Sequence, residues 1–237
     1  MWNDVVELRA FYASPLGLAA RQAIGQQLRS FWPDVRGQRL LGLGYATPYL
    51  GAFRAEALCT IAAMPAGQGA LPWPEGARGL TMLADETALA FPERSFERVL
   101  IVHALEFGEP PREMLREIWR LLTDDGRLLV VAPARRGLWA RSDRTPFGQG
   151  QPYSAFQLTH LLRDCLFTPM GTSRALYLPP IASPTLLRWA PSWERLGRRW
   201  FPRFAGALLI EAGKEIYAAA LQSRVRRRRA TLLPVSP

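Results

Sequence analysis

The sequence is poor in the residues that build disulfide scaffolds and metal centres. Its 237 residues include 2 cysteines and 2 histidines. Cys59 and Cys165 stand alone, with no paired spacing and no histidine beside them, which argues against a disulfide framework and against a structural zinc site. We therefore expect no metal site in this protein.

Long apolar runs are also missing. No window approaches the roughly 18 apolar residues that cross a bilayer, and residues 1–7 lack the basic start and apolar stretch of a signal peptide. We therefore expect a cytoplasmic protein with no transmembrane segment. Hydrophobic residues make up 49% of the chain and charged residues 21%, a composition that excludes disordered and fibrous proteins.

Lysine is nearly absent, and acidic residues are scarce in the second half. Lys214 is the only lysine among 30 basic residues. Residues 1–110 hold 9 basic and 11 acidic side chains, whereas residues 111–237 hold 21 and 9. The net charge of +10 therefore arises in the second half, which excludes a uniform positive surface. That half is expected to face an acidic partner, a membrane or solvent.

Hydrophobic periodicity predicts helices that alternate with short buried strands. Ser14 and Pro15 suit the first two positions of a helix. The predicted helices span residues 14–31, 49–57, 111–122, 154–166 and 185–200. The predicted strands span residues 39–44, 57–64, 80–83, 97–103, 127–133, 174–178 and 207–212. Because most of these strands are apolar throughout, they predict an α/β fold with a doubly wound, mostly parallel seven-stranded sheet covered on both faces.

We expect one domain over residues 1–223. Its core would span residues 36–133, and its substrate-side elements would span residues 134–223. Residues 224–237 are expected to form an arginine-rich flexible tail.

The turn after the first strand is the first candidate binding loop. In a doubly wound sheet, ligands bind beyond the carboxyl ends of the strands, where the strand order reverses. Gly42, Gly44 and Ala46 let the backbone bend sharply and approach a ligand there. A Gly-x-Gly pair is also common in turns that bind nothing, so a purely structural role stays open.

Three further stretches share a recognisable pattern. Residues 85–97 read DETALAFPERSFE, residues 102–106 read VHALE, and residues 114–128 read MLREIWRLLTDDGRL. With the first strand and its loop, they resemble class I S-adenosylmethionine-dependent methyltransferases, in particular the type 11 methyltransferase domain. The first stretch is similar to that family's Asp-Ala-x-x-Leu-Pro-Phe-Pro-Asp-x-Ser-Phe-Asp segment. The last is similar to its Leu-x-Glu-x-x-Arg-Val-Leu-x-Pro-Gly-Gly helix and strand.

The resemblance covers residues 39–133 and implies a Rossmann-like methyltransferase fold with S-adenosylmethionine as cofactor. Outside this range, the periodicity adds an N-terminal helix and a basic helical insertion before the last strand. The residues that it assigns to the cofactor are Gly42, Leu43, Gly44, Tyr45, Ala46, Met64, Asp85 and Glu86.

The cofactor motif is degenerate in this chain. Where the family ends its first strand with an acidic residue, this chain has Gly42, and the last glycine of the family's loop is replaced by Pro48. Met64 stands near the position of the acid that binds the ribose hydroxyls, where hydrogen bonds to a carboxylate contribute on the order of 1.5–3 kcal/mol each. Asp85 matches the acid near the adenine amine, and Glu86 takes a small-residue position beside it.

His103 is the candidate catalytic residue. With Glu106, it follows the fourth strand, where the resemblance places the acceptor and the methyl donor. Histidine can act as a general base for an oxygen or nitrogen nucleophile. The alternative is that His103 only satisfies the loop backbone. His160 lies on a predicted helix and is expected to be a surface or core residue.

The loop after residue 133 is the candidate substrate region. It leaves the same edge of the sheet and contains Arg135, Arg136, Trp139 and Tyr153. Guanidinium groups bind carboxylates and phosphates in a bidentate manner, so an anionic or aromatic substrate fits these residues. The alternative is a loop that its aromatic residues pack over the sheet.

Two basic segments follow this loop. Trp189, Trp193 and Trp200 alternate with arginines between residues 185 and 203. This pattern is typical of an amphipathic helix on a membrane or a partner, but we favour the alternative of a core-packed insertion between the last two strands. The arginine run over residues 224–229 can bind nucleic acid or anionic lipid, or simply be solvated.

The leading hypothesis is an S-adenosylmethionine-dependent methyltransferase that acts on a small or macromolecular, anionic acceptor. Gly42, Pro48 and Met64 favour an alternative, a non-catalytic relative that has lost cofactor binding and serves as a binding or adaptor protein. The basic second half favours a third hypothesis, an RNA-binding or RNA-modifying protein.

Overall fold

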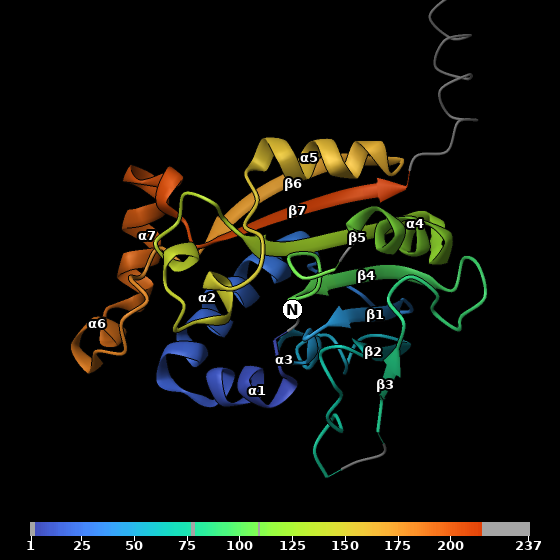
Figure 1. The fold of residues 1–237 in the computed structure, drawn as a ribbon, viewed down its shortest axis with the longest axis horizontal. Coiled ribbons are helices and arrows are strands. Elements are labelled where there is room, and N and C mark those ends of the chain that lie inside the picture. Colours follow the sequence, from blue (N-terminus) through green and yellow to red (C-terminus); the bar gives the residue numbers. More distant parts are fainter. Residues whose placement is uncertain (1–2, 77–78, 109, 215–237) are drawn as a thin grey trace, which may run out of the picture.

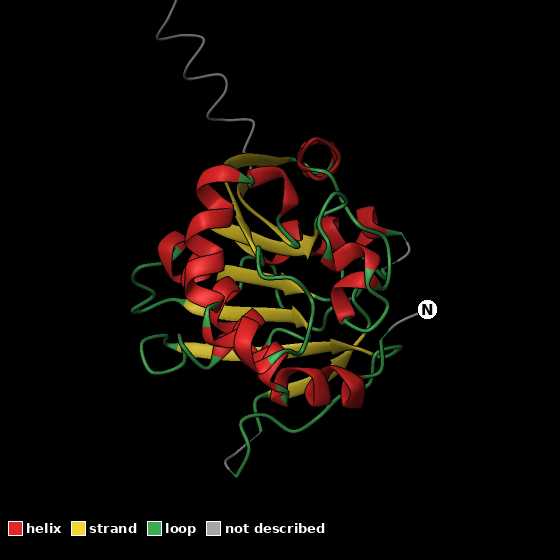
Figure 2. Ribbon diagram, turned by 90° about the vertical axis from the view of Figure 1, so that its left-hand side faces the viewer, coloured by secondary structure: helices red, strands yellow, loops and turns green. Residues whose placement is uncertain are grey.

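The computed structural model describes residues 3–76, 79–108 and 110–214. One sheet runs through the molecule, with helices on both faces (Figures 1 and 2). Its strands follow the order β3-β2-β1-β4-β5-β7-β6. They are β1 (Arg39–Gly44), β2 (Cys59–Pro65), β3 (Thr81–Ala84), β4 (Phe96–Val102), β5 (Leu122–Pro133), β6 (Phe167–Ala175) and β7 (Ala207–Lys214).

The sheet is mostly parallel, as the sequence predicts. Strands β1 to β5 pair in parallel, whereas β7 is antiparallel to both β5 and β6. The predicted doubly wound, seven-stranded fold is therefore confirmed. The carboxyl ends of β1 to β5 share one edge, which we call the carboxyl edge.

Two sets of helices cover the sheet. The helices are α1 (Val5–Ala13), α2 (Pro15–Phe31), α3 (Thr47–Leu50), α4 (Pro111–Leu121), α5 (Ala155–Asp164), α6 (Pro184–Arg188) and α7 (Ala190–Trp200). Short 3-10 helices are η1 (Trp139–Arg141), η2 (Pro146–Gly148) and η3 (Pro202–Phe204). No helix of the described residues is long and apolar enough to cross a membrane.

Neighbouring residues of each strand point to opposite faces, so the strands contribute to two hydrophobic clusters. Leu40 and Leu100 pack with residues of α1 and α2, whereas Leu41 and Ile101 pack with residues of α4 and α5. Both faces are therefore buried, which explains why the strands are apolar throughout.

The helices begin where their capping residues predict. The Ser14 hydroxyl accepts from Gly17 N and Pro15 begins α2. At α5, Ser154 and Gln157 form a reciprocal capping box. Helix α1 is not predicted from the sequence, and three predicted segments differ from the structure, as the following paragraphs describe.

The strand predicted over residues 174–178 lies instead at Phe167–Ala175, as β6. Among the described strands it pairs only with β7, at the edge of the sheet, and its exposed residues are Thr168, Met170 and Thr172. Without an apolar run, periodicity locates only its last residues. Leu176, with φ 65°, ends the strand.

Two predicted helices are shorter than expected. The helix over 49–57 is reduced to α3, which ends at Leu50 and continues as turns. The helix over 185–200 is divided into α6 and α7, which Trp189 separates. The predicted tail over 224–237 lies outside the described residues.

Candidate functional site

The candidate site lies at the carboxyl edge between β1 and β4, where the strand order reverses. Gly44 ends β1 with φ 79°, and a Cβ there would lie 2.2 Å from the carbonyl oxygen of Val102. The next residue, Tyr45, donates its N–H to the same carbonyl over 2.9 Å. The turn therefore requires glycine, because a Cβ at this positive φ would collide with the Val102 carbonyl.

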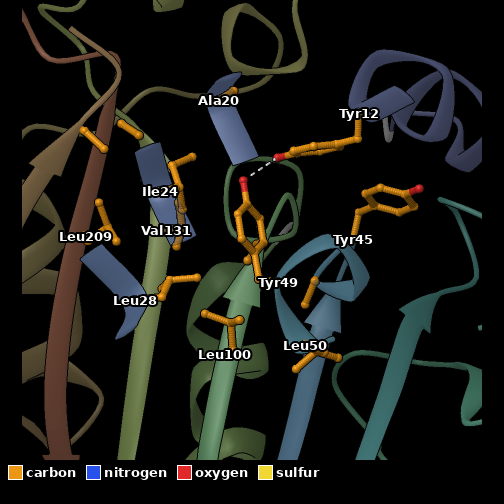
Figure 3. Close-up of a cluster of buried hydrophobic side chains, with 14 of the residues drawn as sticks. Tyr12, Ala20, Ile24, Leu28, Tyr45, Tyr49, Leu50, Leu100, Val131 and Leu209 are labelled. Carbon is orange, nitrogen blue, oxygen red and sulfur yellow. Dashed lines mark hydrogen bonds between the residues drawn. The ribbon is translucent and has the colours of Figure 1, made fainter. Parts of the chain in front are cut away.

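An aromatic side chain of α1 fills the space above this turn. The Tyr12 hydroxyl lies 2.8 Å from Nε2 of His103 and 3.0 Å from the Tyr49 hydroxyl. Its ring stacks on Tyr45 with centroids 5.7 Å apart (Figure 3). Burial is the main cause that raises the pKa of Tyr12 well above its ordinary value, so its hydroxyl stays protonated. Helix α1 thereby covers the site where the segment after β1 meets the loop after β4.

His103 is buried beneath Tyr12. Its Nδ1 lies 3.1 Å from Oε1 of Glu106, and each of the two side chains is 1% exposed. The proton on Nδ1 suits this pairing and leaves Nε2 as the acceptor. Gln68 donates to the His103 carbonyl over 2.9 Å, and the Phe147 ring lies 4.8 Å from the imidazole. The imidazole is thus held on several sides.

Glu106 keeps one oxygen without a hydrogen bond. Its Oε2 is buried and has no partner among the described residues. A buried, unpaired carboxyl oxygen is costly unless a ligand or water satisfies it. Among the described residues that we predicted to form the site, Glu106 beside His103 is therefore the one with a buried polar atom that lacks a hydrogen-bond partner.

A cavity of about 380 Å³ adjoins the turn after β1. This volume is within the range of roughly 300–1,000 Å³ that is typical of small-molecule sites. The lining residues come from α1, the loop after β1, the end of β2 and the following loop. They are Arg9, Tyr45, Thr47, Met64, Leu71, Pro72, Trp73, Glu75 and Gly76. We call this the nucleoside-side cavity.

The residues of β1, its loop and β2 that the resemblance assigns to the cofactor divide into two groups. Tyr45 and Met64 line the nucleoside-side cavity. The others of the first strand and its loop are buried: Gly42, Leu43, Gly44 and Ala46. A Cβ at Gly42 would lie 2.6 Å from Cδ1 of Leu50, so this glycine makes room for α3.

The acidic pair after β3 lies at the surface. Asp85 is exposed, and its Oδ1 accepts from N and Oγ1 of Thr87 over 2.8 and 2.7 Å. Those hydrogen bonds hold the pKa of Asp85 below its usual value. Glu86 is half-buried. Neither residue lines the nucleoside-side cavity, although β3 is the strand beside β2.

A second cavity, of about 600 Å³, lies beyond the end of β5. Four of its lining residues are arginines, and we call it the arginine cavity. Its residues are Ala134, Arg135, Arg136, Tyr153, Ser154, Ala155, Phe156, Gln157, Arg174, Arg203 and Leu208. It therefore joins two predicted substrate arginines with two from β6 and η3.

Tyr153 connects the arginine cavity with the loop after β4. Its hydroxyl donates to the Leu105 carbonyl over 3.2 Å, and burial raises its pKa to about 12. Trp139, also predicted to bind substrate, lies in the core instead. It is fully buried, and its Nε1 donates to the Leu178 carbonyl over 2.6 Å.

The comparisons with known proteins agree with this topology. Residues 42–130 match the family model described as a methyltransferase domain. A methyltransferase from Thermotoga maritima, described as dependent on S-adenosylmethionine, has 16% identity and a TM-score of 0.60 over 89% of this chain and 96% of its own. The chain therefore has the fold of class I methyltransferases, and its residues 42–130 match the family model of a methyltransferase domain.

Two further relatives share this methyltransferase fold or sequence. The 1,6-didemethyltoxoflavin-N1-methyltransferase of Burkholderia thailandensis, solved with its substrate and S-adenosylhomocysteine, has 19% identity and a TM-score of 0.55 over 84% of this chain and 79% of its own. An uncharacterized protein of Mycobacterium tuberculosis is 29% identical over 187 residues, 75% of this chain and 63% of that protein. The match thus spans less than two thirds of that relative.

The matched methyltransferase region runs from β1 to β5 and contains Gly44, Met64, Asp85 and His103. Tyr12 and the residues of the arginine cavity lie outside it. The family pattern therefore carries no signal for them. Sequence reasoning missed Tyr12, Arg174 and Arg203, and it also missed Arg9, Trp73 and Glu75 of the nucleoside-side cavity, because no motif singles them out.

Proposed function

We propose that the chain is an S-adenosylmethionine-dependent methyltransferase of the cytoplasm that acts on an anionic acceptor. The observation that carries the proposal is the position of the nucleoside-side cavity, directly beside the glycine turn at Gly44 and the end of β2. This is the edge where ligands bind in doubly wound sheets.

The residues present fit such a cofactor in the nucleoside-side cavity. The Glu75 carboxyl can accept from ribose hydroxyls, a role that the apolar Met64 cannot fill. The aromatic faces of Tyr45 and Trp73 suit a purine base, and Arg9 suits a carboxylate. Glu75 therefore takes over part of what the degenerate motif has lost. Asp85 does not line this cavity, and its contact with the adenine amine stays a prediction from the resemblance.

The chain's own residues suit the proton transfer. When bound, S-adenosylmethionine supplies an activated methyl group, and catalysis then depends mostly on alignment of the acceptor with it. Glu106 holds Nδ1 of His103, so Nε2 can accept a proton from an acceptor hydroxyl or amine. Because Tyr12 occupies Nε2, α1 must shift before an acceptor reaches the imidazole.

The arginine cavity supports an anionic acceptor. Arg135, Arg136, Arg174 and Arg203 line it without an acidic side chain among its lining residues. Tyr153 joins its wall to the loop that carries His103. A carboxylate or phosphate of the acceptor is expected to bind these guanidinium groups.

Calorimetric titration with S-adenosylhomocysteine tests the cofactor part. We expect binding by the natural protein and about tenfold weaker binding by Glu75→Gln and by Asp85→Ala, equivalent to about 1.4 kcal/mol. Asp125→Asn is the control. Asp125 is exposed near the start of β5, at the end of the strand that lies away from the carboxyl edge. Absence of heat at millimolar ligand overturns the methyltransferase proposal. Unchanged affinity in Glu75→Gln overturns the placement of the ribose.

One observation favours the non-catalytic alternative. Tyr12 contacts His103, Tyr49 and Tyr45. Its side chain thereby occupies the position beside Nε2 of His103 that a methyl acceptor would need. If the closed arrangement is permanent, the protein is a methyltransferase-like binding module. Titration of Tyr12→Ala decides between the two: cofactor binding that appears only in this variant shows that the natural chain holds the site shut.

A further inference from the structure

The segment over residues 181–204 presents an unusual surface, which we call the basic-aromatic face. It carries large exposed apolar side chains: Ile181, Trp189, Leu196, Trp200, Phe201 and Phe204. Trp189 and Trp200 are 63% and 65% exposed. Arginines stand between them, at positions 188, 195, 198, 199 and 203. Large exposed apolar side chains gathered in one short segment indicate an interaction surface.

We propose that the basic-aromatic face docks on a bilayer that contains anionic lipids. An interfacial amphipathic helix combines arginines with Trp, Phe and Leu side chains, and it lies in the headgroup region without crossing the membrane. Helix α7 and its flanking turns have this composition.

The opposite side of α7 is fixed to the protein, so the exposed side chains have a defined orientation. Glu194 accepts from the N–H groups of Tyr177 and Leu178 over 2.6 and 3.4 Å. A Cβ at Gly197 would lie 2.3 Å from Cβ of Tyr177, which shows how closely the helix packs there. The inner face of α7 is therefore packed against the protein, and only its outer face is exposed.

The charge of the face complements an anionic surface. The segment over residues 181–204 contains five arginines and a single acidic residue, Glu194. Because Glu194 is buried and points to the backbone of Tyr177, no exposed carboxyl group of this segment opposes the arginines. Arginines at a membrane surface are attracted by anionic headgroups within about 10 Å.

The outer face also offers an apolar groove of about 590 Å³. Leu186, Trp189, Trp193 and Leu196 line it, together with Arg195 and Arg199. The groove places apolar side chains beside guanidinium groups. It therefore matches an anionic lipid, in which an apolar acyl chain adjoins a negatively charged phosphate. Single-stranded RNA fits less well. It binds by base stacking on aromatic side chains and by phosphate contacts, and the exposed aliphatic side chains of Ile181 and Leu196 contribute to neither.

The face lies at the carboxyl edge of the sheet. Ala207 begins β7 opposite Pro133, the last residue of β5, and opposite Ala175, the last residue of β6. The chain from 181 to 204 connects β6 with β7 at that edge, where Figure 1 shows α6 and α7. Docking would therefore bring the edge that holds His103 towards the lipid surface.

Co-sedimentation of the full chain with vesicles tests the proposal. We expect binding to vesicles of phosphatidylcholine with phosphatidylglycerol, and binding about tenfold weaker to phosphatidylcholine alone or at high salt. The double variant Trp189→Ser/Trp200→Ser and the double variant Arg195→Gln/Arg199→Gln should each lower the binding about tenfold. Leu58→Ser is the matched control, because Leu58 is 72% exposed directly before β2, outside the face.

Three further measurements keep the outcome unambiguous. Equal thermal midpoints for all variants show that the substituted surface residues leave the fold intact. Tryptophan fluorescence should shift to the blue with anionic vesicles, and the shift should vanish in the double tryptophan variant. Changing the arginines of residues 224–229 to glutamine should leave this tryptophan-dependent binding in place.

The proposal is overturned by absence of binding to anionic vesicles, or by equal binding of the double tryptophan variant. It is also overturned if single-stranded RNA at the same salt binds more tightly than the vesicles and depends on the same tryptophans. None of these results bears on cofactor binding, which the calorimetric titration measures separately.

Discussion

The hydroxyl of Tyr12 lies 2.8 Å from Nε2 of His103, although the two residues are 91 positions apart in the sequence. This contact connects α1 with the loop after β4. It places a side chain from outside the matched methyltransferase region on the candidate general base. Access to the imidazole is therefore governed by the position of α1.

Replacing Tyr12 with phenylalanine should destabilise the protein. Nε2 of His103 and the Tyr49 hydroxyl, both buried, would lose a hydrogen-bond partner. We expect the free energy of unfolding to fall by about 1–3 kcal/mol, as measured by urea denaturation. Val6→Ala, at an exposed position of the same helix, should change it by less than about 0.5 kcal/mol. An equal effect of both variants would contradict the bridging role of Tyr12.

Two glycines of the same region should respond in opposite ways to alanine. Gly44→Ala places a Cβ against the Val102 carbonyl at φ 79° and should lower the free energy of unfolding by about 1–3 kcal/mol. Gly51 has φ −55° and open space around its Cβ position. Gly51→Ala should therefore be neutral or stabilise by about 0.4–1 kcal/mol. Thermal unfolding in parallel measures both, and a tolerated Gly44→Ala would show that the turn can relax.

Replacing Trp139 should destabilise the protein, whereas replacing Arg136 should not. Trp139→Ala removes a fully buried ring and its hydrogen bond to Leu178, so we expect a loss of about 3–5 kcal/mol in the free energy of unfolding. Arg136 is exposed in the arginine cavity, and Arg136→Ala should leave stability within about 0.5 kcal/mol. Guanidinium chloride denaturation tests both, and a stable Trp139→Ala protein would show that the ring is not part of the core.

Glu194 should make stability depend on pH. Burial raises its pKa above 4.5, and the N–H donors from Tyr177 and Leu178 only partly oppose this. The folded state therefore binds the proton more tightly than the unfolded state does. The resulting stabilisation is complete below pH 4.5 and is lost as pH rises through the folded pKa.

Glu194→Gln removes this titration. The difference in the free energy of unfolding between the natural protein and this variant should therefore shift in favour of the natural protein as pH falls from 7 towards 5. Urea denaturation at several pH values measures it. A difference that does not change with pH would show that Glu194 titrates alike in both states.

Much of the fold is predictable because its signals are local. Ser14 and Pro15 mark the start of α2 in the sequence as they do in the structure. The apolar runs of β1 and β4 reflect a sheet that is covered on both faces. Strand β6 is different, because its position depends on pairing with β7 and not on its own composition.

The site is predictable only in part, because its two cavities are assembled from segments far apart in the sequence. The family pattern leads to Gly44 and His103. Tyr12 lies on a helix whose buried side chains are few, and its role depends on where α1 docks. Arg174 joins the arginine cavity because β6 pairs with β7 opposite Leu208. Such tertiary neighbours leave no mark in local sequence patterns.

Ser14 is shared by two helices, since it ends α1 and begins α2. Its hydroxyl donates to the Phe11 carbonyl over 2.6 Å and accepts from Gly17 N over 3.0 Å. A shift of α1 away from the sheet can therefore turn about this one residue while α2 stays packed. Amide hydrogens of Val5–Ala13 should then exchange with solvent deuterium faster than those of α2. Such a difference would show that α1 moves away from the sheet while α2 stays bound to it.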